Sequence, residues 1–228
     1  ENALFLTAGV DVQGDRVELE IVGWGRGRTS WSIDYRVIYG DPEKDSFFES
    51  YLTPLLDETW THPSGVEMKL SRIAIDSGHA TTAVYMWARN KGSRVMVVKG
   101  DARTPGIIGQ PTPVEVSHRG RKLRGGVHLW LVNTSLLKEE LYRLLNLNVP
   151  DFEAGEDYPL GFCHFPVSPA HGMEYFQQLS AEQLVTVVRK GYKRREWQKV
   201  RDRNEALDCR VYARAAACAY GLDRWSEE

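Results

Sequence analysis

The sequence predicts an α/β fold in a single domain, residues 1–228, with a mixed five-stranded sheet of three antiparallel and then parallel strands, flanked by helices and carrying inserted hairpins. Three strand-like segments follow one another over residues 4–39, and helix-like and strand-like segments then alternate over residues 45–98. Consecutive strands joined by tight turns pair antiparallel, whereas strands joined through a helix pair in parallel. A chain of 228 residues with 42% hydrophobic residues can also bury one good core.

The first predicted strand is an apolar run that ends in an acid. The run from Leu4 to Val10 is rich in strand-forming residues, as expected of a strand covered on both faces, and Asp11 follows it. The segments 16–21 and 31–39 alternate between polar and apolar residues, which is the period of a strand. Taken alone, Asp11 is more typical of a turn than of a catalytic site, because a Gly-Asp turn follows it closely.

Two pairs of a helix and a strand continue the chain. Residues 45–58 and 81–90 place apolar side chains at helical spacing, and residues 70–75 and 94–98 are short apolar runs. The first of these runs ends in a second acid, Asp76. The two acids therefore end strands that should be central and parallel, and open sheets of this kind form sites outside those ends.

Two basic segments interrupt this framework. Residues 100–126 are rich in Gly, Pro, Thr and Arg and predict an inserted loop or hairpin, and residues 184–200 form a basic hairpin with Tyr192 and Trp197 between its cations. Cations that hold phosphates and rings that stack are typical of a nucleic-acid surface, although a solvated loop and a hairpin facing only water are the alternatives. The candidate DNA-binding residues are Arg119, Arg121, Lys122, Arg124, Lys190, Lys193, Arg194, Arg195 and Lys199.

The remaining chain closes with an alanine-rich helix. The elements before it are a strand at 127–132, a helix at 136–147 that carries Lys138, a short edge strand at 161–166 and a short helix at 171–179. The closing helix, 204–220, is apolar on most of its circumference and should pack closely on the sheet. It carries Glu205 and Asp208 on one face; the helix dipole could account for Glu205, whereas Asp208 lies a turn further in, among residues that must be buried.

Composition excludes several classes of protein. The three cysteines lack the spacing of a metal site or of a disulfide framework and are expected in the core. No apolar run approaches the roughly 20 residues of a membrane span, and the start lacks a signal pattern, so we expect a soluble, cytosolic protein without a membrane partner. The first residue is Glu1 rather than methionine, which suggests an excised domain or a processed product of a longer chain.

Three acids stand where the predicted fold can bring them together: Asp11, Asp76 and Asp208. Clustered carboxylates repel one another and raise each other's proton affinity, so a fold keeps three together mainly where divalent cations neutralise them. Oxygen ligands suit Mg²⁺ or Mn²⁺, and the absence of paired Cys or His argues against zinc.

Four strings narrow this interpretation: residues 9–13 (GVDVQ), residues 75–79 (IDSGH), the Leu129-Trp130 strand before Lys138, and above all residues 203–213 (RNEALDCRVYA). Together they resemble the nuclease domain of the large terminase subunit of lambda-type tailed bacteriophages, in the ribonuclease H-like superfamily. The resemblance covers residues 4 to about 221.

This resemblance agrees with the acids and implies a metal-dependent DNA endonuclease that cuts concatemeric viral DNA during genome packaging. Hydrolysis of the phosphodiester would use two Mg²⁺ or Mn²⁺ ions. Asp11 would bridge the two ions, while Asp76 and Asp208 would complete the separate sites. Glu205 would bind through water or replace Asp208, and Lys138 would contact phosphate or replace charge near the metals.

The resemblance also implies partners: double-stranded DNA, an amino-terminal ATPase domain, the small terminase subunit and the portal, in the host cytoplasm at the procapsid. The sequence has no Gly-x-x-x-x-Gly-Lys-Ser/Thr loop, so that ATPase is missing from this chain. The alternatives are a transposase or a junction resolvase on the same fold, or a catalytically silent DNA-binding module. The string at 203–213 and the insertion at 100–126 favour terminase.

Overall fold

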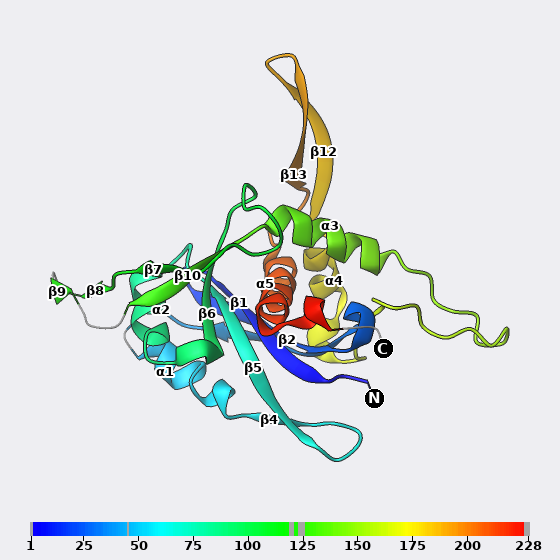
Figure 1. The fold of residues 1–228 in the computed structure, drawn as a ribbon, viewed down its shortest axis with the longest axis horizontal. Coiled ribbons are helices and arrows are strands. Elements are labelled where there is room, and N and C mark those ends of the chain that lie inside the picture. Colours follow the sequence, from blue (N-terminus) through cyan, green and yellow to red (C-terminus); the bar gives the residue numbers. More distant parts are fainter. Residues whose placement is uncertain (1, 45, 119–120, 123–125, 226–228) are drawn as a thin grey trace.

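The computed structural model describes residues 2–44, 46–118, 121–122 and 126–225, with backbone alone for residues 118, 121 and 122. Within these residues, nine strands form one mixed sheet in the order β11-β3-β2-β1-β5-β6-β10-β7, with β4 paired to β5 (Figure 1). The strands are β1 (Phe5–Val12), β2 (Arg16–Trp24), β3 (Ser30–Tyr39), β4 (Thr59–Thr61), β5 (Glu67–Asp76), β6 (Val95–Gly100), β7 (Thr112–Val114), β10 (Val127–Val132) and β11 (Cys163–His164).

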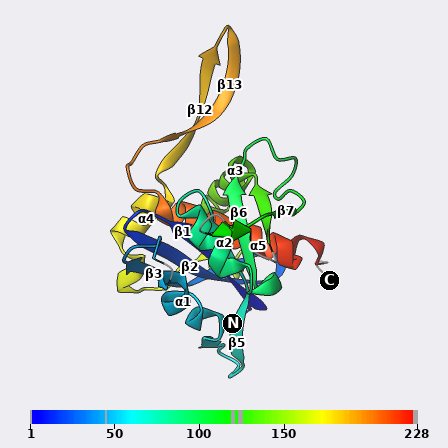
Figure 2. The same cartoon turned by 90° about the vertical axis from the view of Figure 1, so that its left-hand side faces the viewer.

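Helices cover both faces of this sheet, and two small hairpins stand apart from it. The helices are α1 (Phe47–Tyr51), α2 (Thr81–Ala88), α3 (Thr134–Leu145), α4 (Met173–Leu179) and α5 (Glu205–Tyr220). The hairpins are β8 (Ser117–His118) with β9 (Arg121–Lys122), and β12 (Glu182–Arg189) with β13 (Tyr192–Lys199). Both views show the β12–β13 hairpin projecting beyond α3 and away from the sheet (Figures 1 and 2).

The pairing confirms the predicted mixed sheet. Strands β1, β2 and β3 form the antiparallel meander, and β1, β5, β6 and β10 are neighbours in parallel. The five strands of the predicted sheet are the central ones, and the sheet is wider because β10 joins β6, β7 joins β10 and β11 joins β3. Strands β10 and β11 confirm the strands predicted at 127–132 and 161–166. This arrangement of a mixed sheet and flanking helices is consistent with a ribonuclease H-like fold.

The helix predicted over residues 45–58 is wrong in length. The chain instead forms the short α1 and, after a break, a 3₁₀ turn at Pro54–Leu56. Pro54 explains the break, because proline has no N–H to donate and its ring clashes with the preceding helical turn. The apolar spacing persists across the break, so that Phe48, Leu52 and Leu55 are all buried against the sheet.

The two faces of the sheet have separate cores. Alternate residues of β1, among them Ala8 and Val10, pack with α1 and α2, whereas α3, α4 and α5 pack against the other face, with Ala74 of β5 beneath them. Helix α5 is buried on most of its surface, as its alanine-rich sequence predicts. Within the described residues, no helix is both long and apolar enough to span a membrane.

Helix α5 touches the backbone of β1 at Gly9. A Cβ added at Gly9 would lie 1.9 Å from the carbonyl oxygen of Cys209 and 2.4 Å from the amide nitrogen of Ala213. Two residues earlier on the same face, the Thr7 hydroxyl donates a hydrogen bond to the Ala213 carbonyl at 2.8 Å. Only glycine permits this approach, so Gly9 sets how closely the helix lies on the sheet.

A buried ion pair fixes α5 against the neighbouring strand. Arg210, 1% exposed, donates to Glu20 of β2 at 2.7 Å and to the Ser30 hydroxyl of β3 at 2.7 Å. The Tyr175 hydroxyl of α4 donates to the same Glu20 oxygen at 2.9 Å. Because leaving either charge alone in the core would cost about 3–5 kcal/mol, this pair restricts the helix to one rotation about its axis.

Substituting Gly9 should test how much the close approach matters. We expect Gly9→Ala to lower the free energy of unfolding by about 3 kcal/mol, because the new methyl group meets backbone atoms that cannot move independently. Gly14→Ala is the matched control, since a Cβ there would lie 3.6 Å from the His79 ring, an ordinary contact, and should change stability by less than about 0.5 kcal/mol. Urea denaturation measures both, and equal midpoints for the two variants would contradict the expectation.

Candidate active site

Asp11 and Asp76 lie side by side at the carboxyl ends of two parallel strands. Strands β1 and β5 are in register with Val10 beside Ile75, so the next residue of each strand is an aspartate. Asp11 is buried and Asp76 is half-buried. Tyr212 of α5 donates a hydrogen bond to Asp76 Oδ1 at 3.3 Å, which shows that Asp76 points toward the helix.

Asp208 comes to the same edge from the first turn of α5. The contact of α5 with Gly9, two residues before Asp11 on the same face of β1, carries this turn toward the strand ends. The Asn204 amide donates to Asp208 Oδ2 at 2.8 Å and thereby holds the half-buried carboxylate. Residues separated by as many as 197 positions in the sequence thus meet because α5 packs on β1.

The electrostatics of the cluster show that neighbouring carboxylates act on Asp11. Burial, and after it the charge of Asp208, raises the pKa of Asp11 to about 8, with Asp76 and Glu205 adding to the rise and the Gln13 hydrogen bond opposing it. Burial also raises the pKa of Asp76 and the pKa of Asp208. The three aspartates predicted to converge therefore do so.

The carboxylate oxygens of the three aspartates are suitable ligands for a hard divalent cation, although all three aspartates contact other side chains in this structure. Gln13 donates to Asp11 Oδ2 at 2.6 Å, and Lys138 Nζ lies 3.4 Å from Asp208 Oδ1. Among the described residues, no group of three or more His, Cys, Asp and Glu side chains is arranged to hold a metal ion as it stands. Positive charge would nevertheless relieve the repulsion that raises the pKa of Asp11, and carboxylate oxygens are the ligands that Mg²⁺ and Mn²⁺ prefer.

Glu205 occupies a different environment from Asp208. Its carboxylate pairs with Arg16 at 2.5 Å and with Arg203 at 3.4 Å, and both arginines also pair with the buried Glu18 of β2, at 2.7 and 2.6 Å. Two cations thus already compensate the charge of Glu205. Of the two acids on α5, Asp208 has the larger effect on the pKa of Asp11.

Lys138 reaches the cluster through Asp208 and through an acid that sequence reasoning missed. Its Nζ donates to Glu182 Oε1 at 2.8 Å, and both side chains are buried. Asn204 donates to the same Glu182 oxygen at 2.8 Å and accepts a hydrogen bond from Lys199 at 2.6 Å. The root of the β12–β13 hairpin is therefore connected to the helix that carries Asp208.

Some of the missed residues carried a signal in the sequence. Gln13 and Tyr212, which bind the aspartates, both lie within strings that carry the family resemblance, as does Asn204. Glu182 had none, because it begins a strand in a segment without a motif. A lone acid there has no pattern from which to infer its partners.

The candidate DNA-binding residues fall into two groups. On the β12–β13 hairpin, Lys190, Lys193, Arg194, Arg195 and Lys199 are exposed, with Arg195 also paired to Glu139 of α3 at 3.3 Å. In the insertion at 100–126, Arg121 and Lys122 form the backbone of β9, and Arg119 and Arg124 lie outside the described residues.

The hairpin is anchored at its root by an aromatic contact. The Trp197 ring of β13 stacks on Tyr142 of α3, with ring centroids 5.4 Å apart, and its indole N–H donates to Ser135 at 3.0 Å. Beyond this contact both strands are largely exposed. Both views show the hairpin projecting away from the sheet (Figures 1 and 2), so its exposed cations lie on an element that stands apart from the sheet.

A known protein family matches nearly the whole chain. The family model described as "Terminase large subunit gpA, endonuclease domain" matches residues 1–226. The chain belongs to this family. The predicted resemblance to terminase nuclease domains is thereby confirmed.

Two curated relatives of this family cover nearly the whole chain. The chain is 35% identical over 228 residues to the "Terminase, large subunit" of Escherichia phage lambda, which is 99% of this chain and 34% of that protein. It is 32% identical over 225 residues to the "Terminase, large subunit" of Enterobacteria phage P21, which is 97% of this chain and 33% of that protein. The chain thus spans about a third of the length of these relatives. No solved structure matches it significantly.

The raised pKa of Asp11 predicts how the metal-free protein responds to pH. The unfolded chain releases this proton near pH 4 and the folded chain near pH 8, so between these values the folded state holds the extra proton. The free energy of unfolding should therefore fall as pH rises through this window, by up to about 1.4 kcal/mol per pH unit from this group.

Urea denaturation in a chelator at pH 5, 6.5 and 8 measures this dependence. Asp11→Asn should flatten the fall, because the amide carries no charge in either state. Asp41→Asn, in an exposed loop, is the control and should keep the slope of the unsubstituted protein. If Asp11→Asn keeps that slope as well, Asp11 does not hold a proton in the folded protein.

Proposed function

We propose that this chain is a metal-dependent DNA endonuclease that hydrolyses phosphodiester bonds. The observation that carries the proposal is the convergence of Asp11, Asp76 and Asp208 at one edge of the sheet, with the pKa of Asp11 raised by burial and then by the neighbouring carboxylates. Membership of a family described as an endonuclease domain supports the same activity.

The residues of the chain would divide the work as follows. Asp11, on which the charges of both Asp76 and Asp208 act, would ligate both of two Mg²⁺ or Mn²⁺ ions, and Asp76 and Asp208 would each ligate one. When bound, such ions activate water and stabilise the leaving oxygen of the phosphodiester. Gln13 and Tyr212 would orient the oxygens of Asp11 and Asp76 through the hydrogen bonds that they already make.

Two further residues would act beside the aspartates. Lys138 would balance the charge of Asp208 and Glu182, and would approach a phosphate if Asp208 turned to a cation. Glu205, paired with Arg16 and Arg203, would act on the cluster through water or through its charge rather than as the principal ligand on α5.

DNA would be held by the exposed cations of the β12–β13 hairpin. The whole chain has a formal net charge of −2, so attraction to phosphates must come from local clusters. The hairpin offers several cations within a few residues of its turn, and Tyr192 is exposed beside them. Its root contacts Asn204 and α3, so DNA held by the hairpin would lie near the carboxylates.

The family membership supports a proposal for the biological substrate. We propose concatemeric viral double-stranded DNA, cut during genome packaging at the procapsid in the host cytoplasm. The proposed partners are an ATPase domain on the same polypeptide, the small terminase subunit and the portal. Compared with a transposase or a junction resolvase, which would need the same acids, the terminase assignment is favoured by the family match over residues 1–226.

Plasmid nicking tests the nuclease and separates it from a silent DNA-binding module. With Mg²⁺ or Mn²⁺ the protein should nick supercoiled DNA, and Asp11→Asn should slow this by more than about a hundredfold, because even changes around metal ligands cost about ten- to hundredfold. Asp208→Asn should cost more than Glu205→Gln, and Asp41→Asn should be neutral. Undiminished cleavage by Asp11→Asn, or cleavage by the unsubstituted protein in excess chelator, would sink the proposal.

Charge neutralisation tests the hairpin. Lys193→Gln combined with Arg194→Gln should weaken binding to double-stranded DNA and reduce the slope of log affinity against log salt by about 2, since each phosphate contact contributes roughly 0.9. Arg26→Gln combined with Lys69→Gln removes as much charge from exposed sites elsewhere and is the control. Fluorescence anisotropy at 50–200 mM salt measures both pairs, and equal slopes would mean that the hairpin does not hold phosphates.

A further inference from the structure

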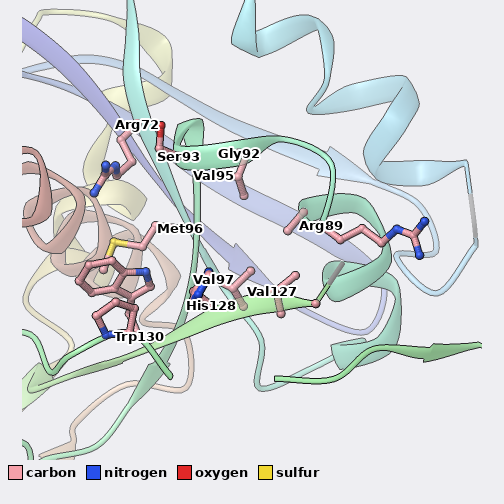
Figure 3. Close-up of a pocket in the computed structure, with 13 residues that line it drawn as sticks. Arg72, Arg89, Gly92, Ser93, Val95, Met96, Val97, Val127, His128 and Trp130 are labelled. Carbon is pink, nitrogen blue, oxygen red and sulfur yellow. The ribbon is translucent and has the colours of Figure 1, made fainter. Parts of the chain in front are cut away.

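A second concave site lies at the opposite end of the strands from the aspartates. The pocket has a volume of about 400 Å³ and is lined by Val95, the first residue of β6, and by Val127, the first of β10, together with Arg72, Trp130 and others (Figure 3). This volume is within the range of pockets that hold small ligands. None of the residues assigned to the proposed catalytic site lines this pocket.

Helix α5 separates this pocket from the candidate active site. Arg72 precedes Asp76 by four residues on β5, which is about 13 Å along a strand. Between them Ala74, on the same face, is fully buried in the core that α5 helps to form. A ligand at Arg72 would therefore occupy a different position from one at Asp76.

Arg72 is a half-buried cation that makes no hydrogen bond or ion pair with a described residue, although the Tyr220 hydroxyl acts on it electrostatically. The buried Nε–H group of Arg72 donates no hydrogen bond to a described residue. Arg72 forms no ion pair with any described residue, and the pocket lining contains no Asp or Glu. Burial lowers the pKa of Arg72. Because an uncompensated charge in such a place costs free energy, an anionic ligand would be stabilised there.

The wall beside Arg72 is aromatic and polar. Trp130 is half-buried and its ring contacts no other ring among the described residues, while His128 and Ser93 are exposed at the rim. Figure 3 shows Arg72 and Trp130 on the same side of the pocket with Met96 between them. In this view the guanidinium of Arg89 points away from them.

We propose that this pocket binds a phosphate that is attached to a planar base, with Arg72 pairing with the phosphate and Trp130 stacking on the base. A guanidinium forms two parallel hydrogen bonds to a phosphate, and an exposed indole face stacks on any nucleobase. A free nucleotide and an unpaired nucleotide of a DNA strand share this chemistry. The site goes beyond the proposed cleavage and does not depend on it.

Calorimetric titration in a chelator tests the site, because without divalent cations cleavage plays no part in the result. The probes are inorganic phosphate, deoxyadenosine 5′-monophosphate and a single-stranded trinucleotide of deoxyadenosine with a 5′-phosphate. The protein carries Lys193→Gln and Arg194→Gln throughout, so that the hairpin does not add binding of its own. The monophosphate should bind more tightly than inorganic phosphate by about tenfold, the effect of one stacked base.

Variants assign the binding to named side chains. Arg72→Gln should weaken the binding of the monophosphate by about ten- to hundredfold, as expected for the loss of a charged hydrogen bond. Trp130→Leu should weaken it by about tenfold. Arg36→Gln is the control, since Arg36 is also half-buried but is paired with Asp34 and Glu58. Thermal unfolding without ligand checks the fold, and saturating monophosphate should raise the melting temperature of the parent protein but not of Arg72→Gln.

The trinucleotide distinguishes the two sources of ligand. Tighter binding than the monophosphate assigns the site to a DNA strand, and equal or weaker binding assigns it to a free nucleotide; either result supports the proposal if Arg72→Gln weakens the binding by at least about tenfold. Equal affinities in the parent protein and Arg72→Gln would overturn it, as would no binding of the monophosphate or binding no tighter than that of inorganic phosphate.

Discussion

The candidate active site depends on the contact between the backbones of α5 and β1 at Gly9. A side chain at this position would meet Cys209 and Ala213, so its absence allows the helix to lie directly on the strand. Asp208 is one residue before Cys209 on the helix, and Asp11 is two residues after Gly9 on the strand. Any change in this separation would therefore move one carboxylate relative to the others.

Charges rather than apolar side chains fix how α5 is turned on the sheet. Strand β2 presents two fully buried acids, Glu18 and Glu20, toward the helix, and each has arginine and tyrosine partners. A buried ion pair contributes little net stability, but separating one is costly. An apolar interface could be satisfied by several rotations of an alanine-rich helix, whereas the Arg210–Glu20 pair is satisfied by one.

The buried elements that carry the aspartates are connected to the projecting β12–β13 hairpin by polar contacts at the root of the hairpin. The aspartates stand on buried strands and on a buried helix, while the β12–β13 hairpin carries its cations on strands that are largely exposed. Glu182 and Asn204 connect the two, because the same Glu182 oxygen accepts from Lys138 and from Asn204. This connection would set where DNA held by the hairpin lies relative to Asp208. The Arg72 pocket, at the other end of the strands, is outside this connection.

The sequence by itself determined the order of the elements, the mixed sheet and the placement of Asp11 and Asp76 at strand ends, because hydrophobic periodicity and turn residues are local signals. It did not determine the break at Pro54 within an apolar helical pattern, nor the edge strand β7, nor that the predicted strands at 127–132 and 161–166 widen the same sheet as β10 and β11. Only the tertiary structure separated Asp208 from Glu205, since both lie in one helical turn and differ in which cations surround them. It alone revealed Glu182 and the half-buried Arg72, because partners far apart in the chain leave no pattern in a single sequence.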